Sequence, residues 1–372
     1  MWPQQFDNAS SQNPPSPLAP LGLLHLIALI LALLASHPAS ASASSPRDFD
    51  LPGTNRPVPV EVSFHLVDLL EIDDEAEAFE FSGILTLLWK DEDLKFDPAV
   101  EGVTEKLFHG AFQWNELSPS WYPQVILANA SQLPEFQAIL ARVTPDGTCT
   151  LIQDLHAVAR NELKLRLFPF DHQRLEAVFE VLGFDSTQVA LKGTPASVTA
   201  DIPTIRVPQW HLDSVSVDFR DKNAPYLSPG AKASSFTLSL NVHRQSFFVV
   251  RLVIIPLLIV VILSWCVFWM DRSSLADRMS VSFVGILTAV AYQAMLGDIM
   301  PHISYITFIN AFISLSFLLM SATAIINLKV CICDRNGNHE LGDLIDRRCK
   351  WIFPLAYLAI IAIAFIFSYL TH

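Results

Sequence analysis

The sequence predicts an α+β membrane protein, in which an exported antiparallel β-sandwich precedes a bundle of four transmembrane helices. Two observations lead to this prediction. Hydrophobic residues make up 51% of the 372-residue chain, and beyond residue 247 they gather in four stretches that hold no charged residue. Before them lie short segments that alternate polar residues with β-branched and aromatic ones, as strands do. We therefore divide the chain into a leader (1–43), an exported domain (44–247) and a transmembrane domain (248–372).

The leader has the features of a secretory signal. Residues 18–34 form an apolar run, and the stretch SHPASASASS after it alternates Ala with Ser as signal-peptidase sites do. We therefore predict a signal peptide over 1–43. The segment before the apolar run has no Lys or Arg, so a misassigned start codon or a retained anchor is an open alternative. Either alternative exports the domain that follows.

The exported domain contains several segments with the alternation of strands, bounded by Pro, Gly or Asp. About ten short strands in about 200 residues are typical of an antiparallel sandwich. The last segment runs into the first predicted helix without a Gly/Ser linker, which predicts a rigid junction. The clearest segments are 57–70, 78–90, 161–168, 175–181, 211–219 and 235–243.

Each charge-free stretch holds about 19 to 26 residues, and about 20 cross the hydrocarbon core as a helix. One such stretch could be a buried core helix, but four in succession predict a multi-pass protein of the plasma, or inner, membrane. If the preceding domain is exported, the cytoplasmic loops hold all the Lys and Arg of the interhelical loops, as the positive-inside rule expects. These loops are 271–278 and 329–350, and the helices are about 248–270, 277–297, 302–329 and 350–370.

The second predicted helix has acidic residues at both ends, although burying a charge in a bilayer costs at least a few kcal/mol. Steps of three and four residues from the first acid define one stripe along the helix. This stripe has a hydroxyl near its inner end and small or apolar side chains in its middle. Its members are Asp277, Ser280, Val284, Leu287, Ala291, Ala294 and Asp298.

Five copies of this stripe around an axis would line a pore. Rings of Asp at both mouths would attract cations, and an apolar ring would close the pore by dewetting. Arg278 is expected to point away from the axis. Residues 46–247 hold 29 acidic and 16 basic residues, so an acidic vestibule would concentrate cations. Two alternatives stay open: the acids cap helix ends at the membrane interface, and the acidic surface serves solubility.

Four motifs follow one another along the chain. They are Trp-x-Asp at Trp89 and Asp91, Trp-x-Pro at Trp121 and Pro123, Phe-Pro-x-Asp at Phe168, Pro169 and Asp171, and the strand-to-helix passage with Arg244 and Pro256. In this order, and ahead of four helices, they resemble the pentameric ligand-gated ion channels, the Cys-loop receptor superfamily. The similarity covers nearly everything after residue 57.

The resemblance implies a homopentamer in which a small-molecule agonist binds between neighbouring sandwich domains. Eukaryotic members close the Phe-Pro-x-Asp loop with a disulfide, but the two cysteine positions are here Asn161 and Leu175. The long cytoplasmic insertion of those receptors is also missing. The chain is therefore most similar to the prokaryotic branch, in particular to amine-responsive bacterial cation channels. Cys149 has no second cysteine in the exported domain to pair with.

By register with this family, we expect a ligand site on the sandwich. A carboxylate at Glu180 corresponds to one in the amine-responsive channels, and beside Phe184 it would suit an ammonium group through ion pairing and cation–π attraction. The alternatives are that Phe184 and Phe236 are core residues and that Glu180 faces solvent. The candidates are Glu180, Leu182, Phe184, Ala128, Tyr226 and Phe236.

Three loops resemble those that couple the sandwich to the helices in this family. By register, Asp74 corresponds to the acid that pairs with Arg244 at the start of the first helix. The coupling candidates are Asp73, Asp74, Phe168, Pro169, Phe170, Asp171, Arg244 and Pro301.

We therefore predict a ligand-gated, cation-selective channel. Its expected partners are a small-molecule agonist such as an amine, permeant monovalent cations and the lipid bilayer. The alternative is a non-conducting, membrane-anchored receptor or binding protein, but such an anchor needs neither four spans nor acids in register. The sequence has no nucleophile elbow, metal-binding His pair or Gly-rich phosphate loop. We accordingly expect no enzyme activity, no cofactor or metal, and no nucleic-acid partner.

Overall fold

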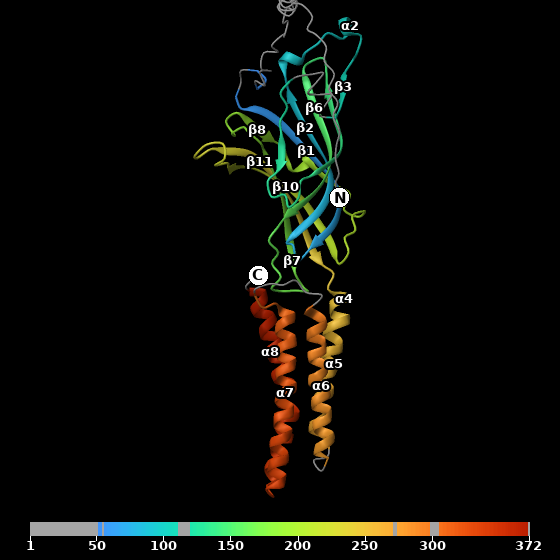
Figure 1. The fold of residues 1–372 in the computed structure, drawn as a ribbon, viewed down its shortest axis with the longest axis vertical. Coiled ribbons are helices and arrows are strands. Elements are labelled where there is room, and N and C mark those ends of the chain that lie inside the picture. Colours follow the sequence, from blue (N-terminus) through green and yellow to red (C-terminus); the bar gives the residue numbers. More distant parts are fainter. Residues whose placement is uncertain (1–50, 54–55, 111–119, 271–273, 298–304, 371–372) are drawn as a thin grey trace, which may run out of the picture. The chain divides into compact units, whose positions relative to one another are not determined.

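The computed structural model describes residues 51–53, 56–110, 120–270, 274–297 and 305–370. All of them belong to one compact unit, Phe49–His372, in which strands precede helices (Figure 1). The predicted signal peptide lies outside the described residues, as do Asp298 and Pro301.

The larger sheet has seven strands within the described ranges, in the order β3-β5-β6-β2-β1-β8, with β9 paired to β1. It is mixed rather than antiparallel as predicted, because β8 and β9 run parallel to β1. A parallel neighbour needs a crossover, and here the chain passes through β7 of the other sheet before it returns as β8. The strands are β1 (Val58–Asp73), β2 (Ala78–Lys90), β3 (Lys106–His109), β5 (Glu135–Val143), β6 (Thr148–Arg160), β8 (Val189–Lys192) and β9 (Val198–Ala200).

The smaller sheet has the order β10-β11-β7-β4 and is antiparallel throughout. Its strands are β4 (Val125–Leu127), β7 (His172–Val181), β10 (Trp210–Asn223) and β11 (Lys232–Arg244). Five of the predicted strands are confirmed, since they overlap β1, β2, β7, β10 and β11. Short helical turns lie at Glu92–Leu94, Pro98–Glu101 (α2) and Pro195–Ser197.

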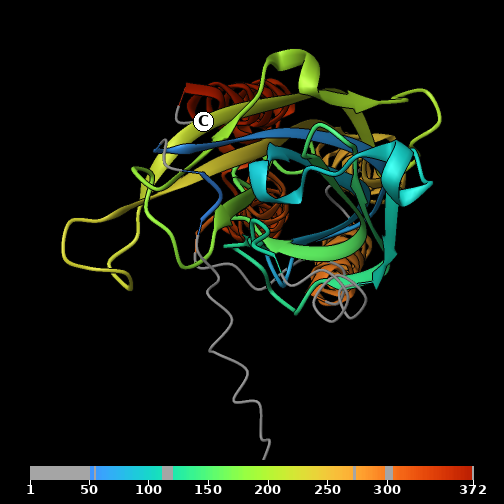
Figure 2. The same cartoon turned by 90° about the horizontal axis from the view of Figure 1, so that it is seen from above.

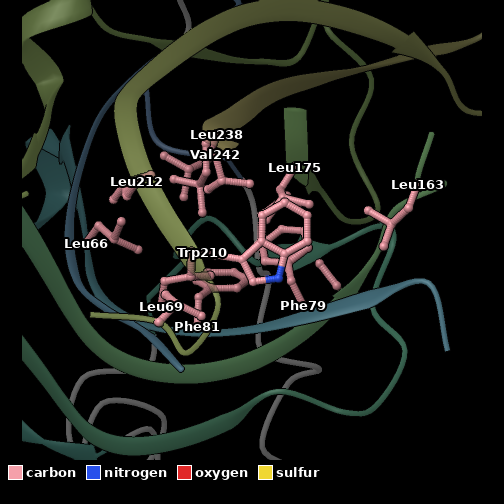
Figure 3. Packing of buried hydrophobic residues seen from close by; sticks show 14 of the residues in the cluster. Leu66, Leu69, Phe79, Phe81, Leu163, Leu175, Trp210, Leu212, Leu238 and Val242 are labelled. Atoms are coloured by element: carbon pink, nitrogen blue, oxygen red, sulfur yellow. The ribbon is translucent and has the colours of Figure 1, made fainter. Parts of the chain in front are cut away.

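The core of the sandwich lies between the two sheets. Every second residue of β1 from Val58 to Leu66 is buried, as the alternation of its sequence predicts. Figure 3 shows side chains from both sheets gathered around the indole of Trp210. Fully burying one large apolar side chain contributes about 1.5–3 kcal/mol, so this cluster is a main source of the sandwich's stability. The labelled members include Leu66, Leu69, Phe79, Phe81, Leu175, Leu212, Leu238 and Val242.

The prediction of a strand at 161–168 is wrong, because this segment is a loop between β6 and β7. Its alternating leucines are buried as in a strand, and Leu163 is one of them. Several of its main-chain groups, however, bond to side chains, and none belongs to a strand ladder. The Lys164 N–H donates to Gln173 and the Leu165 N–H donates to the Tyr305 hydroxyl, each at 3.0 Å. The alternation therefore predicted correctly which side chains are buried, but it did not show that the segment lacks a paired strand.

Within the part of the chain that the structure describes, four helical segments follow β11, and consecutive segments pack against one another. Figure 2 shows them from above, nearly end-on. Two of them, Phe247–Trp269 and Phe308–Arg335, are long and apolar enough to cross a membrane. The segments are α4 (Phe247–Val249) continuing through a π-helical turn (Val250–Ile254) into α5 (Ile255–Trp265) and a 3₁₀ turn (Cys266–Trp269), then α6 (Leu275–Gly297), α7 (Phe308–Arg335) and α8 (His339–Leu370).

The bounds of the last two helices differ from the prediction. The helix α7 begins after Thr307, whose hydroxyl accepts the N–H of Asn310, rather than at 302. The helix α8 begins at His339 rather than at 350, so most of the predicted loop 329–350 is helical. Absence of charge delimits an apolar segment, but a helix continues beyond it wherever charged side chains reach water.

Candidate functional site

Arg244, the last residue of β11, is the centre of a buried cluster of charges. Its Nη2 lies 2.9 Å from a carboxylate oxygen of Asp74, and its Nε lies 2.9 Å from one of Asp171. The side chains of Arg244 and Asp171 are 3% and 0% exposed, against 21% for Asp74. The predicted ion pair between Asp74 and Arg244 is present, and Asp171 is a second partner that the sequence did not predict.

The register of the smaller sheet explains this cluster. His243 pairs with His172 across β11 and β7, so the next residue, Arg244, lies beside Asp171. Trp210 is the partner of Arg244 on β10, and its ring lies 4.0 Å from the guanidinium carbon. Strand register, once known, would have identified both contacts.

The cluster keeps Arg244 charged. Burial alone would lower the pKa of the guanidinium, but the hydrogen bond to Asp74 and the charge of Asp171 outweigh it and raise that pKa. Asp73 shapes the adjoining β1–β2 turn, since its carboxylate accepts the N–H groups of Glu75 and Ala76 at 2.9 Å. A cavity of about 540 Å³ opens between this turn, Arg244 and α4.

The Phe-Pro-x-Asp loop joins this cluster to the helices. Phe168 and Pro169 are buried, and the Phe168 ring lies 4.7 Å from the Arg244 guanidinium carbon. The Phe170 ring lies 6.0 Å from that of Phe308 in α7 and 6.1 Å from that of Phe365 in α8, centroid to centroid. The structure therefore brings together every coupling candidate within the described residues.

The predicted stripe forms an uncovered face of α6. Its six described members are all exposed, with Val284 at 64% and Leu287 at 71%. Phe283 and Val290 are also exposed, so the uncovered face is wider than the stripe. Asp277 is exposed at the start of this face. In a membrane protein, such a face can line a shared passage or meet another copy.

Arg278 lies on the opposite side of α6, as predicted. Its side chain is 2% exposed. The guanidinium donates to both carboxylate oxygens of Asp346 in α8 at 3.1 Å and to the carbonyl of Val267 at 3.0 Å. The only basic residue of α6 is thereby paired away from the stripe.

Two of the ligand candidates, Glu180 and Tyr226, are in contact with each other. The Tyr226 hydroxyl donates to the Glu180 carboxylate at 3.2 Å, and partial burial together with the charge of Glu180 raises the pKa of Tyr226. Leu182 and Ala128 are exposed, and Phe184 is half-buried edge-on against Trp121, with ring centroids 6.0 Å apart.

Phe236, a ligand candidate by register, lies in the core, which is the alternative that the sequence left open. Its side chain is fully buried, and its ring stacks on that of Phe179 with centroids 4.8 Å apart. Phe236 shares its strand face with Leu238 and Leu240, which point into the core. The period of two along β11 was the signal that could have excluded it.

A β-sandwich joined through a buried cluster of charges to helices, two of which are apolar enough to cross a membrane, fits a membrane receptor. Residues 48–246 match the family described as neurotransmitter-gated ion-channel ligand binding domain. The chain belongs to this family, that of the pentameric ligand-gated ion channels, which are not enzymes. Membership implies pentameric assembly, a small-molecule ligand and an extracellular ligand-binding domain.

Known relatives are similar over much of the chain. It is 24% identical over 317 residues to the proton-gated ion channel of Gloeobacter violaceus, covering 85% of each chain. It is 25% identical over 270 residues to the pH-sensitive chloride channel 2 of Anopheles gambiae, covering 70% of this chain and 43% of that one. It is 23% identical over 297 residues to the human gamma-aminobutyric acid receptor subunit rho-3, covering 77% and 62%. Chloride channels stand among these relatives, so membership does not determine the sign of the permeant ion.

Proposed function

We propose that this chain forms a homopentameric channel of the plasma, or inner, membrane that an extracellular small molecule opens and that conducts monovalent cations. The single observation that supports cation selectivity is the charge on the uncovered face of α6. That face begins with the exposed Asp277, while Arg278 is buried against Asp346. Five copies would therefore place a ring of carboxylates at the inner mouth with no neutralising cation from the same helix.

The middle of the same face supplies the proposed gate. Val284 and Leu287 are uncovered in the single chain, and between Asp277 and Gly297 the face has no further acid or base. Ser280, Ala291 and Ala294 complete the described part of the stripe. Apolar rings expel water when they close together, so a ring of Leu287 would stop conduction by dewetting. We place Asp298 at the outer mouth by its position in the sequence.

All four helical segments span the membrane in this proposal. The stretch Trp351–Leu370 of α8 is free of charged residues and long enough to cross, and α6 becomes acceptable to a membrane when its uncovered face lines water. The coupling residues of the sandwich, including Asp73, Asp74 and the Phe-Pro-x-Asp loop, then lie at the outer membrane surface, and we expect Pro301 there from its position in the sequence.

The agonist site lies on the smaller sheet around Glu180 and Tyr226. Glu180 is almost fully buried, and its carboxylate accepts a hydrogen bond from the Tyr226 hydroxyl. A primary ammonium group offers three donors and a charge, which a carboxylate prefers over a phenol. We therefore propose a small amine that contacts Glu180 and Tyr226, with Leu182, Phe184 and Ala128 around it.

Recordings from the purified chain in planar bilayers test this proposal. A panel of primary amines, carboxylic acids and acidic buffers is applied to the sandwich side, and Glu180→Gln serves as the isosteric control. We expect one or more amines to evoke current in the native chain and a higher midpoint, by at least roughly tenfold, in Glu180→Gln. Current evoked by acid alone would refute the proposal that the agonist is an amine. Amine binding to verified pentamers without any current would favour the non-conducting receptor.

A further inference from the structure

The loop between β6 and β7 is closed at its neck by one side-chain amide. The Asn161 Nδ2 donates to the carbonyl of Arg174 at 3.2 Å, and the N–H of Glu176 donates to the Asn161 Oδ1 at 3.0 Å. These two main-chain groups flank Leu175, so position 175 lies opposite position 161. Asn161 thereby joins the two ends of the loop without a covalent bond.

Two further side chains hold the loop extended. Gln173 pairs with both main-chain groups of Lys164, each at 3.0 Å, and its amide also donates to Asp171 at 2.8 Å. Tyr305, which precedes α7, accepts the N–H of Leu165 at 3.0 Å and donates to the carbonyl of Leu163 at 3.2 Å. Each side chain thus satisfies one main-chain donor and one acceptor, which a neighbouring strand would otherwise do.

The tip of the loop bears the groups that contact the helices. Asp171 binds Arg244, Phe170 packs against Phe308 and Phe365, and the Phe308 N–H donates to the Arg166 carbonyl at 2.9 Å. Because the loop has no ladder of its own, the position of this tip depends on these side-chain contacts together with the closure of its neck by Asn161.

We propose that Asn161 is a positioning residue for channel opening. Its amide closes the loop, so that Phe170 and Asp171 keep their contacts while the sandwich moves. The proposal rests on the chain being a ligand-gated channel and is independent of its ion selectivity. If the proposal is correct, a different bond that joins positions 161 and 175 should also close the loop and keep the channel able to open.

A disulfide provides that other bond. Because position 175 lies opposite position 161, Asn161→Cys combined with Leu175→Cys is the variant in which a reducible disulfide can replace the amide, and the loss of both free thiols shows that the bond has formed. Asn161→Ala removes the closure, and Asn161→Asp keeps the acceptor for Glu176 but loses the donor. Each single cysteine variant controls for the loss of the native side chain.

Hydrogen–deuterium exchange on the intact pentamer is the first measurement. We expect Asn161→Ala to speed exchange of the amides of Lys164 and Leu165 and of the first turn of α7 by roughly tenfold, with Asn161→Asp in between. The oxidised double-cysteine variant should regain native protection and lose it in reductant, while a general structural defect would not respond to reduction. Native protection in Asn161→Ala would overturn the proposal.

Current is the second measurement, with n-propylamine as the probe. We expect Asn161→Ala to raise the midpoint for n-propylamine and the oxidised double-cysteine variant to restore it. If exchange follows the expected pattern but the midpoint stays native, Asn161 closes the loop without positioning it for opening, and the proposal is wrong. If n-propylamine opens no channel at all, the amine assignment fails, and the comparison is made on the leak current of Leu287→Ser, a variant in which the proposed gate residue is polar. In that background Asn161→Ala should lower the leak current and the oxidised double-cysteine variant should restore it, whereas an unchanged current would overturn the proposal.

Discussion

Arg244 binds two acids that differ in their surroundings. The Asp171 carboxylate is fully buried, whereas the side chain of Asp74 is 21% exposed. An unpaired buried charge costs far more than one that reaches water. The two acids are therefore not equivalent, although both lie 2.9 Å from the same guanidinium.

Substitutions in this cluster should differ in how much they lower the free energy of unfolding. Arg244→Ala leaves Asp171 buried without its cation, so we expect a loss of about 3–5 kcal/mol in the free energy of unfolding. Asp74→Ala leaves the pair with Asp171 intact and should cost about 1 kcal/mol. Urea unfolding followed by circular dichroism measures both losses. Equal losses would show that Asp171 does not hold Arg244 as described. A charge swap with Asp74 should not rescue, because an acid at 244 would face Asp171.

Cys149 gives a prediction with a defined pH dependence. Burial, reinforced by the nearby carboxylates of Asp91 and Asp146, raises the pKa of its thiol to about 12. The unfolded thiol ionises near its ordinary pKa of about 8.5. Above that pH the unfolded state has lost its proton and the folded state retains it, so stability falls as pH rises, by up to about 1.4 kcal/mol per unit.

Thiol labelling checks directly that Cys149 is buried in the folded state. In a chain whose other cysteines are replaced by Ser, maleimide at pH 8 should leave Cys149 unmodified in the native state and react rapidly after unfolding. Cys149→Ser should weaken the fall in stability between pH 9 and 11. Fast labelling of the folded chain would contradict the burial of this thiol. The replaced residues are Cys266, Cys331, Cys333 and Cys349.

At the level of strands and helices, the sequence was informative wherever a single period determines the structure. Alternation located β1, β2, β7, β10 and β11, and steps of three and four found the uncovered face of α6. It failed at 161–168, because burial alternates there without a partner strand. It also gave no sign that Asp171 shares Arg244, because that contact depends on register between strands far apart in the chain.

The face of α6 leads to a prediction about the gate. Leu287 is 71% exposed on the stripe, and Leu318 of α7 is 63% exposed but lies on another helix. Leu287→Ser should hydrate a ring of five side chains and favour the open pore, whereas Leu318→Ser should not. Ion flux from liposomes without agonist measures the difference. Equal flux from the two variants would place the constriction elsewhere.

At the level of the whole molecule, charge is distributed unevenly. The chain has a formal net charge of −13, and residues 46–247 alone have 29 acidic against 16 basic residues. In a pentamer this surplus would surround the outer entrance and raise the local concentration of cations. The effect is screened by salt, so the contribution of the vestibule to conductance should shrink as ionic strength rises.

The most direct test of a cation-selective pore lined by α6 is the reversal potential in a NaCl gradient. The Leu287→Ser background supplies current without an agonist, and Asp277→Asn removes the proposed ring of charge while preserving its shape. The account predicts reversal near the sodium equilibrium potential for the background alone and a clear shift toward zero once Asp277 is replaced. Reversal near the chloride potential, or a sodium-selective value that Asp277→Asn leaves unchanged, would contradict it.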